Sequence, residues 1–382
     1  MNAATPVRVG FIPLTDCAPL VVAATHGFDR RHGIELRLSR EPSWATLRDR
    51  LLVGAIDAAH LLHGLAYGIE LGIAGPRADM AVLMTLNRNG QAITLARHWV
   101  QQGVVDGPSL ARAIARSARP LVFAHTFPTG THAMWLQYWL AAHGIHPHVD
   151  VRMLTVPPQQ MVARLASGAI DGYSAGEPWN ARAVRDGIGC TLATSQSIWP
   201  DHPEKVLACR REFVSGQPAL ARALAAAVLD AARWLEQQAD LDELARVLAQ
   251  DRFVGCDAVD IADRLKARYV DGCGRRWDDA HGLRFFDGGR VPFPYLSDGM
   301  WFMTQQRRWG LLREDPDYVG VASAVSQIAL YREVAAMLGV ACPESPCRSS
   351  VLVDGRAWDG SEPAAYAASF AIAHAAPAAV PA

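Results

Sequence analysis

The sequence contains no run of about 18–20 apolar residues, the length that a helix needs to span a bilayer. Its beginning, "MNAATPVRVGFIPLTDCAPL", has no basic segment followed by a signal-peptide core, because Pro13 and Asp16 interrupt the apolar pattern that starts at Val7. We therefore expect a cytoplasmic protein that makes no contact with a membrane.

An excess of charge of either sign is also missing. The 37 basic and 38 acidic residues leave a formal net charge of −1, which gives no general attraction to nucleic acid or to an anionic lipid surface. We expect no direct binding of nucleic acid, so any role in RNA regulation would require a protein partner.

Motifs for disulfides, metals and common enzymes are absent as well. The seven cysteines are an odd, scattered set without a CxxC pair, and no paired His or Cys ligands are visible, so we expect reduced thiols and no metal site. The chain has no GxSxG, HExxH, GxxxxGK[ST] or GxGxxG motif, so we expect neither an enzyme nor a bound cofactor. One enzymatic alternative stays open, with Cys17 as nucleophile and His132 as base.

What the sequence does contain is an internal repeat. "RLLVGAIDAAH" at 50–60 is echoed by "RLASGAIDGYS" at 164–174, and each copy lies in a longer strand–helix–strand–helix–strand pattern. Such βαβαβ units predict parallel sheets with functional loops at the carboxyl ends of the strands. We interpret Asp57 and Asp171 as structural residues of the joint between helix and strand.

Two copies of this unit in 382 residues predict an α/β protein of two lobes with a ligand in the cleft between them. We place lobe 1 at 1–100 and 205–382 and lobe 2 at 101–204. The helical stretches at 220–250 and 296–340 are expected to return to lobe 1.

Three loops, in the first copy of the repeat or directly after it, are candidates to line the cleft. In "PLTDCAP", Thr15 and Asp16 precede a helix, where they could serve only as caps. Trp44 in "SREPSWATLRD" either plugs the core or offers its indole N–H to a ligand. In "TLNRNGQAITLA" the asparagines fit a turn, whereas Gln91 begins a strand and can aim amide N–H groups inward.

Further candidates follow in the second copy. Thr131 and His132 in "HTFPTGTHAMWL" stand at the start of a helix, where free N–H groups favour an anion. "GEPWN" places Glu177 and Trp179 at the lip of the cleft, unless this turn is purely structural. Lys205 enters an apolar run, which is costly without a partner. A bound anion would supply that partner, so we expect no carboxylate beside it.

Several ordered motifs, including "LSREPSWATLRDRL", "LNRNGQAIT", "VPPQQMV", "IDGYSAGEPWN" and "HPEKVL", resemble the nitrate- and bicarbonate-binding family of substrate-binding proteins over residues 7–340. The resemblance implies the two-lobed periplasmic-binding-protein fold of type II. It also implies that the ligand contacts Trp44, Gln91, His132 and Lys205. Bicarbonate-binding members carry an acidic residue in place of Lys205, so nitrate or nitrite is the expected ligand. Cys17 departs from the small residue that is usual there.

The family contains both receptors of ABC transporters and cytoplasmic NasS-type sensors. Because no signal sequence is visible, the resemblance implies a nitrate/nitrite sensor that sequesters a NasT-like, RNA-binding antiterminator and releases it when the ligand binds. The alternative is the substrate-binding component of a nitrate or bicarbonate transporter.

Overall fold

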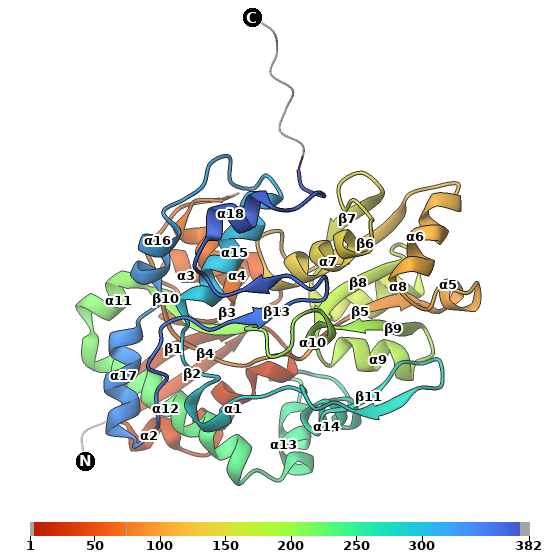
Figure 1. Cartoon of the computed structure of the whole chain (residues 1–382). Coiled ribbons are helices and arrows are strands. Elements are labelled where there is room, and N and C mark those ends of the chain that lie inside the picture. Colours follow the sequence, from red (N-terminus) through yellow and green to blue (C-terminus); the bar gives the residue numbers. More distant parts are fainter. Residues whose placement is uncertain (1–3, 74, 375–382) are drawn as a thin grey trace, which may run out of the picture.

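The computed structural model describes residues 4–73 and 75–374, which form two lobes, each built on a five-stranded sheet (Figure 1). The sheet of the first lobe has the spatial order β2 (Ile34–Arg40), β1 (Thr5–Phe11), β3 (Ala58–Leu62), β10 (Lys205–Arg210) and β4 (Met80–Thr85). The sheet of the second lobe has the order β7 (Val151–Thr155), β6 (Leu121–His125), β8 (Gly172–Gly176), β5 (Gln91–Ala96) and β9 (Gly189–Thr194). The two-lobed α/β fold is thus the one that the repeat predicted.

Helices cover both sheets. Those of the first lobe are η1 (Thr15–Cys17), α1 (Ala18–Thr25), α2 (Phe28–Arg31), α3 (Trp44–Leu52), α4 (His63–Glu70), α11 (Arg211–Gly216), α12 (Pro218–Gln237), α15 (Leu296–Arg308), α16 (Tyr318–Val325) and α17 (Ile328–Met337). Those of the second lobe are α5 (Arg97–Gln101), α6 (Gly107–Arg116), α7 (Thr131–Ala142), η2 (Pro158–Gln160), α8 (Met161–Ala166), α9 (Trp179–Arg185) and α10 (Ser195–Ile198). As expected, the long helices that follow residue 217 return to the first lobe, where α12 packs on α1 and α15 on α4.

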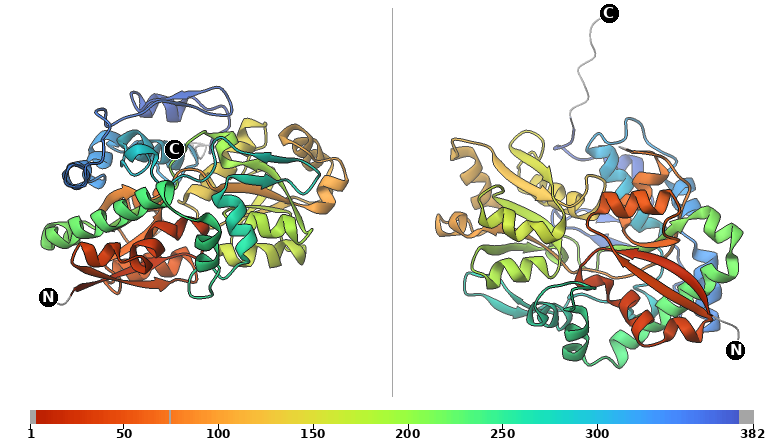
Figure 2. Two further views of the ribbon diagram at one scale, coloured as in Figure 1. Left: turned by 90° about the horizontal axis from the view of Figure 1, so that it is seen from below. Right: turned by 180° about the vertical axis from the view of Figure 1, so that it is seen from behind.

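The remaining elements lie outside the two five-stranded sheets, in the teal and blue segments of Figure 2. They are α13 (Leu241–Leu248), α14 (Ala258–Leu265), β11 (Arg268–Val270), β12 (Arg276–Asp278), η3 (Asp287–Gly289), β13 (Ser350–Val351), β14 (Ala357–Trp358) and α18 (Pro363–Ala368). The segment around β13 and β14 bridges the lobes, because Tyr138 Oη of α7 donates to Asp354 Oδ1 at 2.9 Å while Trp358 Nε1 donates to the Ser297 carbonyl of α15.

Two details of the fold differ from the expectation. The lobe boundary at residue 100 is wrong for β5, which pairs with β8 and β9 and so belongs to the second sheet from Gln91 onward. The sheets are mixed and not purely parallel, since β10 and β5 each run antiparallel to both of their neighbours. Both differences have one cause: each of these strands has crossed over from the other lobe and enters its sheet from the opposite direction.

The two crossover segments, 86–90 and 195–204, lie side by side. Leu86 N donates to the Lys205 carbonyl at 2.7 Å, and Asn89 N donates to the His202 carbonyl at 3.2 Å. Asn89 and Gly90 have positive φ angles of 60° and 90°, a conformation that Asn and Gly adopt at little cost. The paired segments connect the two lobes, and they place Gln91 and Lys205 at the start of the outgoing strands.

Candidate functional site

A set of polar side chains is completely enclosed where the two lobes meet. We call it the interlobe cluster, and it consists of Asp16, Trp44, His60, Gln91, Thr131, His132, Glu204 and Lys205. Each of these residues is at most 2 % exposed. Both lobes and the crossover segments contribute to it, so its geometry depends on how the lobes close.

Local structure explains how three of the predicted ligand residues reach the cluster. Ser43 caps α3 by accepting a hydrogen bond from Thr46 N, which fixes Trp44 as the first helical residue. Lys205 Nζ lies 5.7 Å from the centre of the Trp44 ring. His132 stands in the first turn of α7, with Nε2 3.4 Å from Glu204 Oε1.

Gln91 reaches the same place through strand pairing. It faces Gly176 across β5 and β8, and a Cβ atom on Gly176 would lie 3.5 Å from His132 Nε2. That distance is ordinary van der Waals contact, so the α7 histidine lies against β8, next to the strand that carries Gln91. The structure therefore brings Trp44, Gln91, His132 and Lys205 together, as predicted, while their contact with a ligand stays a prediction.

The surroundings of Lys205 differ from the expectation. Lys205 Nζ donates to Asp16 Oδ2 at 2.8 Å and also to Glu204 Oε1, so the cation has two carboxylate partners. Burial opposes its charge, but the two carboxylates outweigh burial and raise the pKa of Lys205. The prediction that no carboxylate stands beside this lysine is wrong, because the turn at Thr15–Cys17 and the crossover segment both direct an acid at it.

The two carboxyl groups respond differently to this environment. Burial alone would raise the pKa of Asp16, yet Lys205 and His60, whose Nε2 lies 2.9 Å from Asp16 Oδ1, hold it well below its usual range. Burial raises the pKa of Glu204 to about 7, because Lys205 and Thr131 only partly offset the desolvation and Asp16 adds repulsion. Asp16 is thus a permanent anion, whereas Glu204 titrates near neutrality.

Both histidines of the interlobe cluster are neutral. Burial is the largest effect on each ring and lowers the pKa of His132 well below its usual range, an effect that Lys205 reinforces. Burial likewise lowers the pKa of His60 despite its contact with Asp16. His132 Nδ1 is hydrogen-bonded to the hydroxyl of Thr126, and when that hydroxyl donates, Nε2 carries the proton of the neutral ring.

Several buried polar atoms of the interlobe cluster have no hydrogen-bond partner within the described residues. They include the indole Nε1 of Trp44, both amide atoms of Gln91 and Nε2 of His132, and the neighbouring hydroxyl of Thr15 has none either. Buried polar groups are nearly always paired, so unpaired donors from both lobes at one point fit a polar ligand there. The donors among them, next to a lysine, suit a small oxyanion.

The other candidates have structural roles. Glu177 is buried and accepts from Arg264 Nε at 2.8 Å, and its carbonyl accepts from Thr15 N at 2.8 Å across the lobes. Trp179 Nε1 donates to the carbonyl of Pro13 at 3.1 Å. The Trp179 indole and the backbone carbonyl of Glu177 therefore connect the two lobes, while the Glu177 carboxylate is paired with Arg264 instead of being free for a ligand. Thr131 contributes indirectly, because its hydroxyl donates to Glu204 at 2.8 Å.

Cys17 is fully buried next to Asp16. Burial, and then the negative charge of Asp16, raise the pKa of its thiol far above the usual range, so the thiolate is suppressed. That environment is the opposite of the one that activates a cysteine nucleophile.

Sequence reasoning missed His60 and Glu204. His60 interrupts the apolar run "AAHLL" of β3, and a histidine in a buried strand is a usable signal. Glu204 precedes Lys205 directly, and adjacent residues of a regular strand point to opposite faces. Here Glu204 lies outside β10, in the crossover segment, where its N–H donates to the Asn87 carbonyl.

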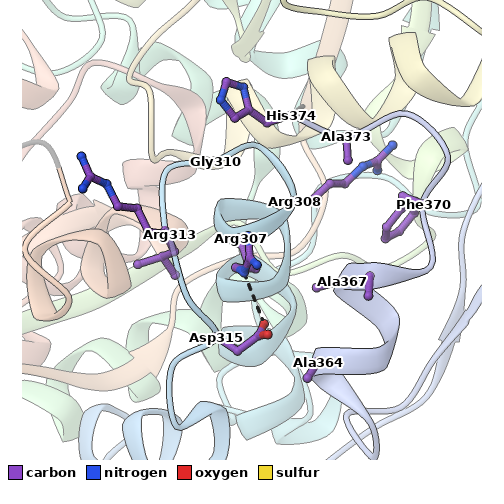
Figure 3. Close-up of a pocket in the computed structure, with 12 residues that line it drawn as sticks. Arg307, Arg308, Gly310, Arg313, Asp315, Ala364, Ala367, Phe370, Ala373 and His374 are labelled. Carbon is purple, nitrogen blue, oxygen red and sulfur yellow. Dashed lines mark ion pairs between the residues drawn. The ribbon is translucent and has the colours of Figure 1, made fainter. Parts of the chain in front are cut away.

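A surface pocket of about 770 Å³ lies elsewhere, between α15 and α18 (Figure 3). Arg307, Arg308 and Arg313 line it together with alanines of α18, but none of the interlobe cluster does.

Within residues 4–73 and 75–374, no group of three or more His, Cys, Asp or Glu side chains is arranged to hold a metal. No helix of these residues has the length and apolarity of a bilayer span.

Comparison with known proteins identifies relatives along nearly the whole chain. The nitrate/nitrite binding protein NrtA of Nostoc sp. is 35% identical over 376 residues, which cover 95% of this chain and 84% of that protein. The bicarbonate-binding protein CmpA of Synechococcus elongatus is 28% identical over 394 residues, which cover 96% and 86%. The crystal structure of the periplasmic nitrate-binding protein NrtA from Synechocystis superposes with a TM-score of 0.92 at 35% identity, covering 96% of this chain and 98% of that one.

The predicted resemblance is confirmed at the level of family and fold. A model of the NMT1-like family matches residues 2–249, which is more than half of the chain. The chain belongs to the NMT1-like family and has the two-lobed fold of the periplasmic nitrate-binding protein NrtA.

Proposed function

We propose that this chain binds nitrate or nitrite in the interlobe cluster and does not convert it chemically. The observation that carries the proposal is the convergence of a buried lysine with unpaired donors from Trp44, Gln91 and His132. Nitrate is a planar monoanion that accepts hydrogen bonds and donates none, so these groups are complementary to it. The similarity to relatives named for nitrate and nitrite binding supports the same ligand.

Bicarbonate is the competing ligand. The carboxylates of Asp16 and Glu204 favour it, because bicarbonate can donate its hydroxyl to an acceptor. Lys205 favours nitrate, because its ammonium group has donors for the oxygens of either anion but no acceptor for the hydroxyl of bicarbonate. With four heavy atoms at about −1.5 kcal/mol each, a favourable bound on affinity is a Kd of roughly some tens of μM.

Calorimetric titration with nitrate, nitrite and bicarbonate tests the ligand. We expect one nitrate per chain in the unaltered protein and none in Lys205→Glu. Lys266, the chain's other lysine, pairs with Asp242 at the surface, so Lys266→Glu is the matched control and should bind normally. Nitrate binding that survives Lys205→Glu would overturn the proposed site, and binding that is seen only with bicarbonate would overturn the nitrate assignment.

For the biological role, the relatives favour the substrate-binding component of an ABC importer. Besides NrtA, they include the nitrate import ATP-binding protein NrtC of Synechocystis, 34% identical over 367 residues that cover 95% of this chain and 55% of that protein. The role of a cytoplasmic sensor with a NasT-like antiterminator partner remains a second prediction, derived from the motif resemblance. In either role the paired crossover segments would let the anion favour closed lobes, and a partner that prefers one form would then be linked to the ligand.

The two roles differ in the partner and in its response to nitrate. Affinity purification of the native protein from nitrate-starved cells, followed by a nitrate wash, separates them. Recovery of membrane permease subunits supports the importer role. Release of an RNA-binding protein by nitrate, but not by chloride, supports the sensor role and overturns the importer role.

A further inference from the structure

The carboxylate of Glu204 lies beside two of the four groups that the proposed function assigns to the anion, Lys205 and His132. Thr131 Oγ1 donates to it at 2.8 Å, Trp135 Nε1 donates at 3.5 Å, and Lys205 Nζ donates to the same oxygen as Thr131. His132 Nε2 lies 3.4 Å from that oxygen. A carboxylate is itself a planar oxyanion, so Glu204 competes for the groups that would hold nitrate.

The charges around this carboxylate add a second constraint. Lys205 is the one cation of the interlobe cluster, and it faces two carboxylates, those of Asp16 and Glu204. The neighbouring rings of His60, His132 and His202 are all kept neutral by burial, which lowers the pKa of His202 to about 3. The enclosed site is therefore already negative before a ligand enters.

Adding a monoanion would place a second uncompensated negative charge in a site that water does not reach. Uncompensated buried charge is expensive, and proteins avoid it by changing the protonation of a neighbouring group. Asp16 is poorly suited to accept a proton, because Lys205 and His60 both stabilise its anion. Glu204 shares Lys205 with Asp16 and is enclosed among α7 side chains, so neutralising it cancels the charge that the ligand adds and frees Lys205 to bind the ligand.

We propose that Glu204 takes up one proton from solvent when an oxyanion binds to the interlobe cluster, so that the protein binds the anion and a proton together. The step forms an O–H bond on the Glu204 carboxylate and breaks none in the ligand. The inference rests on the proposed anion-binding function and adds its regulation by pH. It also makes Glu204 a specificity residue, since a neutral carboxyl group donates a hydrogen bond to an anion that has only acceptors.

Linkage gives the direction of the pH dependence. Burial raises the pKa of Glu204 to about 7 in the free protein, and a bound anion would raise it further. Below about pH 7 the proton is already present, so affinity is independent of pH. Above about pH 7 each bound anion must bring a proton, and Kd rises about tenfold per pH unit.

The test is calorimetric titration with sodium nitrate at pH 6, 7, 8 and 9, each in two buffers with different ionisation enthalpies. We expect close to one proton taken up per nitrate at pH 8 in the unaltered protein and close to none in Glu204→Gln. The Kd of Glu204→Gln should stay constant across this range. Glu70→Gln is the control: Glu70 is also buried, pairs with Arg211 and lies outside the cluster, so this variant should keep the uptake.

The possible results separate this inference from the proposed function. Nitrate binding with the same Kd at pH 6 and pH 9 and no proton uptake overturns the inference alone. Uptake that persists in Glu204→Gln assigns the proton to another group, such as His132, and overturns it too. If Glu204→Gln does not fold, the buffer dependence of the unaltered protein still decides whether a proton is bound. No binding of nitrate, nitrite or bicarbonate at any pH overturns both proposals.

Discussion

Asp171 in the second lobe has the same structural role as Asp57 in the first. Each aspartate exchanges two hydrogen bonds with the first strand of its repeat: Asp57 Oδ2 accepts from Arg8 N and Asp171 Oδ2 from Val122 N, both at 2.8 Å. The N–H of each aspartate donates back to the carbonyl of the same residue. The repeated Gly-Ala-Ile-Asp motif thus joins a helix to the middle strand of each sheet, as the structural interpretation predicted.

Replacing Asp171 by Ala should therefore reduce stability without affecting anion affinity. Its carboxylate is 3% exposed and also accepts two bonds from Arg119 and one from Trp99, so its removal leaves several donors unpaired. We expect a loss of about 2–3 kcal/mol, measured by thermal and urea unfolding. Asp57→Ala is the matched comparison and should cost less, because that site is more exposed. A change in nitrate affinity without loss of stability would contradict the structural role.

The repeat predicted the two-lobed architecture well, because periodicity and turn residues are local signals. Gly54 and Gly168 end their helices with φ angles of 72° and 71°, which glycine tolerates and which the repeated sequence marks clearly. What local signals could not show is which sheet a strand joins. β5 and β10 are ordinary apolar strands in sequence, and only their pairing partners reveal that the chain has changed lobes.

The candidate site was predictable in its donors but not in its charges. Trp44, Gln91, His132 and Lys205 all follow a strand or begin an element in recognisable motifs. Asp16 was also a candidate for the cleft, but neither its pairing with Lys205 nor the place of Glu204 could be predicted in the same way. Asp16 lies 189 residues from Lys205 in the chain, and the position of Glu204 depends on irregular backbone in the crossover segment. Contacts between segments so far apart depend on the tertiary fold, because η1 and the start of β10 meet only when the first lobe is assembled.

Replacing Trp44 by Phe should separate ligand binding from stability. The substitution keeps the buried ring beside Lys205 but removes an N–H that has no partner among the described residues. We expect nitrate affinity to fall roughly tenfold while the melting temperature of the ligand-free protein stays the same or rises slightly. Fluorescence-monitored melting and calorimetry measure the two quantities.

Trp358→Phe is the control for that experiment and should show the opposite pattern of stability and affinity. Trp358 is equally buried, but its Nε1 donates to the carbonyl of Ser297 at 2.9 Å. Its loss should lower the melting temperature and leave nitrate affinity unchanged. If Trp44→Phe lowered stability as much as Trp358→Phe and left binding intact, the indole of Trp44 would be a core residue and not a ligand donor.

Cys17 should be unreactive in the folded protein. Burial and the charge of Asp16 raise the pKa of the thiol, so at pH 8 iodoacetamide should modify the exposed Cys273 but leave Cys17 unmodified. Peptide mass spectrometry reports each site separately, and labelling in denaturant is the positive control. Cys17→Ser should retain one-to-one nitrate binding. Rapid alkylation of Cys17 together with chemical conversion of the ligand would instead support the enzymatic alternative.

The titration of Glu204 should make the stability of the ligand-free protein depend on pH. In the folded state burial raises the pKa of this carboxyl to about 7, whereas the unfolded chain ionises near pH 4.5. Between these values the folded protein holds a proton that the unfolded chain has released, so stability falls as pH rises from about 4.5 to about 7 and then levels off.

Glu204→Gln lacks this titration. Its melting temperature should be close to that of the unaltered protein at pH 5 and higher at pH 8, where the difference in stability reaches about 3 kcal/mol. If the difference in stability between the two proteins is the same at both pH values, Glu204 is ionised throughout. The charge of Lys205 would then outweigh burial in setting the pKa of Glu204.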